Sequence, residues 1–143
     1  MHPEARHRAR QAALQILYQW EVGKVSVDAA CRTVLDLQWP PDEAPPADDV
    51  REFAAALARD TVERVAAMDA LIAETSERWR PERMAIVDRL ILRMCACEMH
   101  RDPGTPPAVI INEAIELARL FSGEDSVKFI NGMLDGIRRK MER

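Results

Sequence analysis

MAIVDRLILRMCACEMH, residues 84–100, is a strongly apolar segment of this 143-residue chain. Its apolar side chains recur every three or four residues, the spacing that places them on one face of an α-helix. A helix with so broad an apolar surface is expected to lie at the centre of the fold, covered by other helices. The face consists of Met84, Val87, Ile91, Met94, Cys95 and Glu98, and it is widened by Ile86, Leu90 and Leu92.

The composition of the whole chain also favours helices. It contains 21 alanines and 11 leucines but only five glycines and 5% aromatic residues, a mixture typical of helices and not of sheets. With 48% apolar residues, a chain of this length can bury one core without disulfides or a structural metal. We therefore expect an all-α fold in a single domain, residues 1–143.

Helical periodicity outside the central segment predicts a compact bundle of six or seven helices. Ser26 is a favourable cap for a helix that points Ala30, Val34 and Leu37 inward. Gly132, in the middle of a helix, is expected to permit the close approach of another helix. The expected helices cover residues 4–22, 26–38, 48–79 (allowing a break near Asp69), 84–100, 108–121 and 125 onward.

A proline-rich loop interrupts this pattern at residues 39–47, WPPDEAPPA. Four of the nine prolines lie there, which excludes a helix or an interior strand. Residues 40–52 carry five acidic side chains against Arg51, and this excess equals the net charge of −4 of the whole chain. Because the acidity is local, it does not exclude a nucleic-acid partner. We expect two halves, about 1–79 and 80–143.

The start of the first expected helix breaks a local electrostatic rule. Arg6, His7, Arg8 and Arg10 lie at the positive end of the helix dipole, where cations are disfavoured. Free backbone N–H groups and arginines at such a position suit phosphate binding, and Tyr18 can stack on unpaired bases. The alternatives are exposed arginines without a function and a half-buried packing role for Tyr18.

A second feature lies at the start of the last expected helix. Asp125 and Ser126 are good capping residues, and Phe129, beside Lys128, falls off the apolar stripe of that helix. Such an aromatic residue forms either a second packing face or an exposed contact, and spacing alone leaves both open.

The sequence contains no pattern typical of an enzyme, a cofactor site or a metal site. Cys31, Cys95 and Cys97 have no second pair of ligands at metal-binding spacing, and small buried thiols in a reducing compartment are the simpler interpretation. A glycine-rich phosphate loop, a signal core and an apolar run of membrane length are all missing from the sequence. We expect a cytoplasmic protein without catalytic activity, cofactor or metal.

Five blocks of the sequence resemble the NusB family of transcription antitermination factors. The blocks occur in the family's order and extend over nearly the whole chain. They are ARHRAR at 5–10, ALQILYQWE at 13–21, DRLILR at 88–93 with Glu98, INEAIELAR at 111–119 and KFINGMLD at 128–135.

The resemblance implies a NusB-like fold of two small helical bundles packed into one domain, and a bacterial protein that is not an enzyme. Family members pair with a ribosomal small-subunit protein, called NusE in this role. They bind the boxA element of nascent ribosomal RNA transcripts as single-stranded RNA and act with other Nus factors and RNA polymerase. The residues in matching positions imply RNA contacts by Arg6, His7, Arg8, Arg10, Tyr18, Asp125, Lys128 and Phe129.

The resemblance also implies a contact between the ribosomal protein and Asp88, at an exposed helix start. Asp88 is shorter than the Glu of some members, and Ser76, near Trp79, stands where an aromatic residue is usual. The proline-rich loop is atypical of the family, and we expect it to lie away from the RNA path.

Two other functions compete with RNA binding. One is a protein-only helical scaffold. The other is an accessory domain of an RNA cytosine methyltransferase, which the chain length and the lack of a glycine-rich loop disfavour. The sequence leaves a homodimer open, since no heptad pattern demands one.

Overall fold

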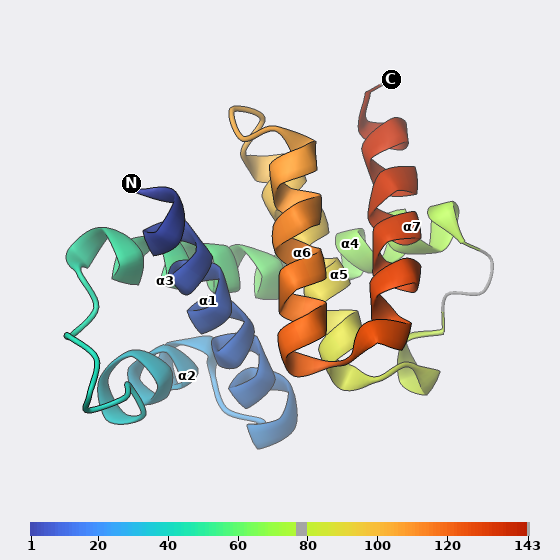
Figure 1. Cartoon of the computed structure of the whole chain (residues 1–143). Helices are drawn as coiled ribbons and strands as arrows, with labels where there is room; N and C mark the ends of the chain where they lie inside the picture. Colours follow the sequence, from blue (N-terminus) through green and yellow to red (C-terminus); the bar gives the residue numbers. More distant parts are fainter. Residues whose placement is uncertain (77–79, 143) are drawn as a thin grey trace. The chain divides into compact units, whose positions relative to one another are not determined.

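Figure 1 shows the computed structural model, which describes residues 1–76 and 80–142; all regular secondary structure in these ranges is helical. The expected all-α fold is confirmed, with seven α-helices in the described part of the chain. The chain forms two compact units, Met1–Glu63 (unit 1) and Arg64–Arg143 (unit 2). This boundary precedes the expected one near residue 79, because the helix that follows Arg64 packs on helices of unit 2. No described helix has both the length and the apolar character needed to cross a membrane.

Unit 1 is built around helix α1, Pro3–Gly23, which packs along α3, Asp48–Glu63. Pro3 fits the first helical turn, where the His2 ring accepts a hydrogen bond from the Glu4 N–H at 3.2 Å. Both helices bury small side chains, which allow close packing. Those that are fully buried include Ala9, Ala12, Ala13, Ala54 and Ala58.

The helix after α1 begins as predicted but ends differently. Helix α2, Val27–Arg32, is capped by Ser26, whose hydroxyl accepts a 3.1 Å hydrogen bond from a backbone N–H. It continues into a π-helical segment, η1, Thr33–Leu37. A π turn holds more residues than an α turn, so later side chains rotate away from the positions that 3.6-residue spacing predicts. Leu35 is buried and Leu37 is 80% exposed, and the prediction that Leu37 points inward is wrong.

Unit 2 is assembled around α5, Ile86–Arg101, as the apolar segment predicts. Every residue from Leu90 to Met99 is buried, and three helices pack against α5. These are α4 (Val65–Thr75), α6 (Pro107–Phe121) and α7 (Glu124–Met141), and a 3₁₀ turn, η2 (Pro81–Arg83), precedes α5.

Arg93 on α5 is buried, and its charge is met by α4. Its Nε and Nη2 atoms donate to the two carboxylate oxygens of Asp69 at 2.8 and 2.7 Å, the bidentate geometry of a strong charged pair. Asp69 thus ties α4 to α5 and is not the site of a helix break. The break lies at Arg64, and Trp79, the expected helix end, lies outside the described residues.

Close helix packing occurs at Gly136, and not at Gly132 as the sequence predicts. A Cβ added at Gly132 would meet no described heavy atom of its surroundings within 4 Å, whereas one at Gly136 would lie 2.6 Å from Thr75 Cγ2. The Thr75 hydroxyl donates to the Leu71 carbonyl at 3.0 Å, which restricts its side chain. Helices α4 and α7 therefore meet at Gly136.

Gly132→Ala is expected to raise the free energy of unfolding by about 0.5–1 kcal/mol, because alanine favours a helix and nothing obstructs it. Gly136→Ala gains the same propensity but displaces Thr75, at a cost of about 1–3 kcal/mol. It is therefore expected to be neutral or destabilising. Chemical denaturation measures both variants, and equal stabilisation by the two would contradict the close contact at Gly136.

Candidate nucleic-acid interface

The basic residues at the start of α1 point in two directions. Arg6 and Arg10 are four residues apart and share a helix face. Their guanidinium carbons lie 5.9 and 5.5 Å from the ring centroid of Phe53 on α3. Arg8 lies on another side of the helix and contacts Trp39. The predicted basic segment is therefore divided between the α3 side and the side of the acidic loop.

Arg10 is not a surface residue. It is 1% exposed, because its place one turn after Arg6 directs it towards α3, where the Phe53 ring covers its guanidinium. This burial disfavours the predicted direct RNA contact by Arg10. Arg6 is half-buried, and the Arg8 side chain is 24% exposed, so these two arginines retain an accessible surface.

The acidic loop contacts Arg8, so the expectation that the loop lies away from the RNA path and the predicted RNA contact by Arg8 are in conflict. Arg8 Nε donates to Glu43 Oε2 at 3.2 Å, and the Arg8 guanidinium carbon lies 3.9 Å from the Trp39 ring centroid. The Trp39 indole N–H donates to the Ala44 carbonyl at 2.9 Å, which closes the loop. The number of charges in a segment of the sequence does not predict that the loop folds back onto Arg8.

His7 and Tyr18 have different surroundings on α1. His7 is half-buried, and its Nε2 lies 3.4 Å from Nε2 of Gln11, one turn further on. Tyr18 is 43% exposed, which favours a contact surface over buried packing. It follows Arg8 by ten residues, about 15 Å along the helix. A ligand that reaches both side chains must therefore be extended.

Asp125, Lys128 and Phe129 are all exposed at the start of α7. Spacing leaves open whether Phe129 forms a second packing face or is exposed. The ring is 36% exposed, which favours the exposed position. The N-cap residue is Gly123, at a φ of 146° that favours glycine, and not Asp125. A cation and an aromatic ring thus occupy adjacent exposed positions in the first turns of a helix.

Asp88 is 8% exposed, so the prediction that it lies at an exposed helix start is wrong, and a direct contact with the partner is disfavoured. Its Oδ1 accepts a hydrogen bond from Ser122 Oγ at 2.6 Å, and its Oδ2 accepts one from Ser126 Oγ at 2.8 Å. The carboxylate therefore joins α5 to the turn after α6, through Ser122, and to the first turn of α7, through Ser126. Sequence reasoning missed this role because the serines lie 34 and 38 residues away, beyond any local pattern.

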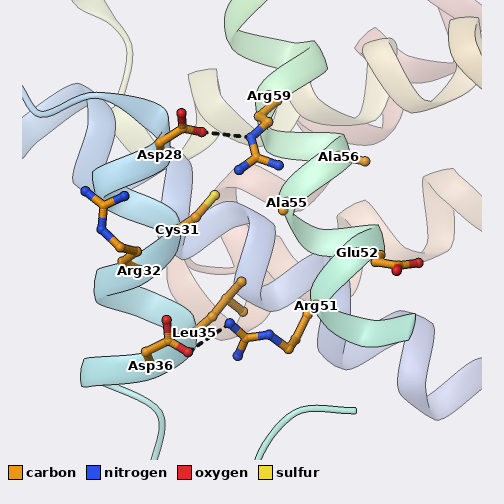
Figure 2. A pocket seen from close by; sticks show the side chains of 10 residues that line it. All are labelled: Asp28, Cys31, Arg32, Leu35, Asp36, Arg51, Glu52, Ala55, Ala56 and Arg59. Carbon is orange, nitrogen blue, oxygen red and sulfur yellow. Dashed lines mark hydrogen bonds and ion pairs between the residues drawn. The ribbon is translucent and has the colours of Figure 1, made fainter. Parts of the chain in front are cut away.

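Residues of α2, η1 and α3 line a groove of about 640 Å³ in unit 1, and Figure 2 shows their side chains. Two ion pairs span it, Asp28–Arg59 at 2.9 Å and Asp36–Arg51 at 2.8 Å. Because carboxylates pair these arginines, the groove is not a basic surface. Burial raises the pKa of the Cys31 thiol, which favours its protonated, unreactive form. In residues 1–76 and 80–142, no three His, Cys, Asp or Glu side chains are grouped for a metal ion.

Comparison with known proteins provides the context for this geometry. A sequence model of the NusB family matches residues 7–139. The chain belongs to the NusB family. It is 49% identical over 137 residues to transcription antitermination protein NusB of Solibacter usitatus (strain Ellin6076), covering 96% of this chain and 90% of the relative. It is 42% identical over 141 residues to the NusB protein of Koribacter versatilis (strain Ellin345), with the same coverage.

Solved structures of NusB proteins share the fold. T. maritima NusB matches with a TM-score of 0.81 and 30% identity, covering 96% of this chain and 97% of that one. A crystal structure of antitermination factors NusB and NusE in complex with dsRNA matches with a TM-score of 0.82. Its identity is 22%, over 96% of this chain and 98% of that one, which supports the fold alone. The NusB family consists of transcription antitermination factors and not of enzymes.

Asp88→Ala is expected to lower the free energy of unfolding by about 2–4 kcal/mol, because it removes a buried charged acceptor shared by two hydroxyls. Asp125→Ala serves as the control, since it removes an exposed carboxylate from the first turn of α7 and is expected to cost less than about 1 kcal/mol. Urea denaturation measures both variants. Equally small losses would show that Asp88 is no structural anchor.

Proposed function

We propose that this antitermination factor binds the boxA element of nascent ribosomal RNA transcripts, together with the ribosomal small-subunit protein NusE. The observation that carries the proposal is the exposed pair Lys128 and Phe129 at the start of α7. Phenylalanine is ordinarily buried, and an exposed ring beside a cation suits the stacking and phosphate contacts by which single-stranded RNA is recognised. Membership of the NusB family supports the same role.

The proposed RNA contacts are side chains that offer a positive charge, an aromatic face or a hydrogen-bonding group at the surface. Cations neutralise phosphates, rings stack on unpaired bases, and the remaining polar groups bind base edges. Arg10 contributes indirectly, because its packing on Phe53 holds the first turns of α1 against α3. The direct contacts are Arg6, His7, Arg8, Tyr18, Asp125, Lys128 and Phe129.

NusE binding is extended to this chain from the relative crystallised with NusE and dsRNA. Asp88 is buried, so its proposed contribution to this partner is indirect. It holds Ser122, which is exposed, and the first turn of α7 in place. Other Nus factors and RNA polymerase would join through the resulting complex.

Native mass spectrometry of the chain with single-stranded boxA RNA, with and without NusE, tests the proposal. RNA is expected to bind, and to bind more tightly when NusE adds its surface to the complex. Binding of NusE without any addition of RNA mass or affinity would instead identify the protein as a helical scaffold that does not contact RNA. The same spectra report whether the chain forms a homodimer.

Replacement of both Arg6 and Arg8 by alanine is expected to weaken RNA binding and to flatten its salt dependence. At about 0.7 per phosphate on single strands, two lost contacts change the slope of log K against log salt concentration by about 1.4. Fluorescence anisotropy at several salt concentrations measures the slope. The control replaces Arg59 and Arg119, two exposed arginines that pair with carboxylates. If this control flattened the salt dependence equally, the start of α1 would not be the RNA-binding site.

A further inference from the structure

Arg8 is held by the acidic loop and remains at the surface. Its guanidinium carbon lies 3.9 Å from the Trp39 ring centroid, whereas Arg6 and Arg10 lie 5.9 and 5.5 Å from that of Phe53. The short distance indicates a close cation–π contact. Since the Arg8 side chain is 24% exposed, Trp39 supports the guanidinium without covering it.

Trp39 itself has a fixed position at the base of the loop. Its indole N–H donates to the Ala44 carbonyl at 2.9 Å, and the Glu43 N–H donates to the Pro40 carbonyl at 3.1 Å. Four prolines in residues 39–47 restrict the backbone further. The loop is therefore an ordered support for Arg8 and not a loose acidic tail.

Glu43 engages Arg8 weakly. The contact joins a single atom pair, Nε to Oε2, at 3.2 Å, which is longer than the 2.7–2.9 Å range typical of charge-assisted hydrogen bonds. Within residues 1–76 and 80–142, no other hydrogen bond or ion pair of the Arg8 guanidinium occurs. A phosphate can pair with two guanidinium nitrogens at once, so it is the stronger partner for the same group.

We propose that Trp39 is a positioning residue of the RNA-binding site, which holds the Arg8 guanidinium at the surface for a phosphate, and that Glu43 is the counter-ion displaced by that phosphate. This inference rests on the proposed function and adds two residues of the loop to its site. Trp39 and Glu43 act in opposite directions, because the first orders the cation and the second competes for it.

The size of each effect follows from the exposure of the contact. The Glu43 side chain is 44% exposed, and solvent-exposed pairs of this kind change an equilibrium by at most about fivefold. The cation–π contact survives phosphate binding, because a phosphate pairs with the edge of the guanidinium and leaves its face on the indole. Loss of Trp39 leaves RNA to order a flexible arginine, which lowers affinity.

Fluorescence anisotropy with single-stranded boxA RNA tests both effects. Glu43→Gln is expected to tighten binding about two- to fivefold, and Asp42→Asn is the matched control. It removes the same charge from the same exposed loop at a residue for which the structure shows no pair with Arg8, so it is expected to change affinity less. Trp39→Ala is expected to weaken binding about two- to fivefold, with circular dichroism confirming intact helices.

One further substitution and an Arg8→Ala background make the test decisive. Trp39→Phe retains a ring under Arg8 and is expected to lose less affinity than Trp39→Ala. In an Arg8→Ala background, Trp39→Ala is expected to have no effect, and Glu43→Gln is expected to match Asp42→Asn. The inference is overturned if Glu43→Gln weakens binding or equals its control in the native background, or if the Trp39 effect is missing or persists without Arg8.

A separate measurement distinguishes failure of this inference from failure of the proposed function. If the unmodified protein binds no RNA, the proposed function fails, and the NMR signal of the Arg8 Nε–H group is then followed while inorganic phosphate is added. The signal is expected to shift at lower phosphate concentration in Glu43→Gln than in the unmodified protein. Identical titrations would overturn the role of Glu43 as a displaceable counter-ion.

Discussion

A guanidinium group that leaves water needs a partner for its charge, and this requirement shapes both units. In unit 2, Arg93 is matched by Asp69, and the bidentate pair fixes α4 against α5. In unit 1, Arg10 is buried against Phe53, which fixes the first turns of α1 against α3. Arg8 meets the same requirement at the surface. The chain has 17 arginines and three lysines. A guanidinium group can stack on an aromatic ring and also pair with a carboxylate, so arginine is suited both to buried contacts and to the surface.

The helices were predictable because their signals are local. The apolar spacing of α5, the hydroxyl of Ser26 and the prolines of the loop each act within a few residues. The prediction that Leu37 points inward is wrong because a π turn changes the helical repeat on which this prediction depends. Gly132 was mistaken for the close contact because only the packing of α4 shows that Thr75 meets Gly136 instead. Local patterns therefore define elements, and tertiary partners decide which face of each element is used.

The candidate site follows the same division. The spacing leaves open whether Phe129, beside Lys128, packs or is exposed, and the resemblance to the NusB family implies a contact; the structure shows both side chains exposed. The role of the loop was missed because Glu43 lies 35 residues from Arg8. The net charge of a chain or of a segment does not report where its charged side chains lie in the folded protein. An acidic loop can therefore repel a polyanion on average while Trp39 within it holds the cation that the polyanion needs.

Asp88 shows how a side chain can influence a binding surface that it does not touch. Both of its carboxylate oxygens are occupied, by Ser122 and Ser126. A partner that took the carboxylate for itself would deprive both hydroxyls of a charged acceptor, at a cost of about 1–3 kcal/mol each. The carboxylate is therefore better suited to orient the first turns of α7, which carry Lys128 and Phe129. A change at Asp88 would then alter the proposed protein-binding and RNA-binding surfaces together, because both proposals depend on the start of α7.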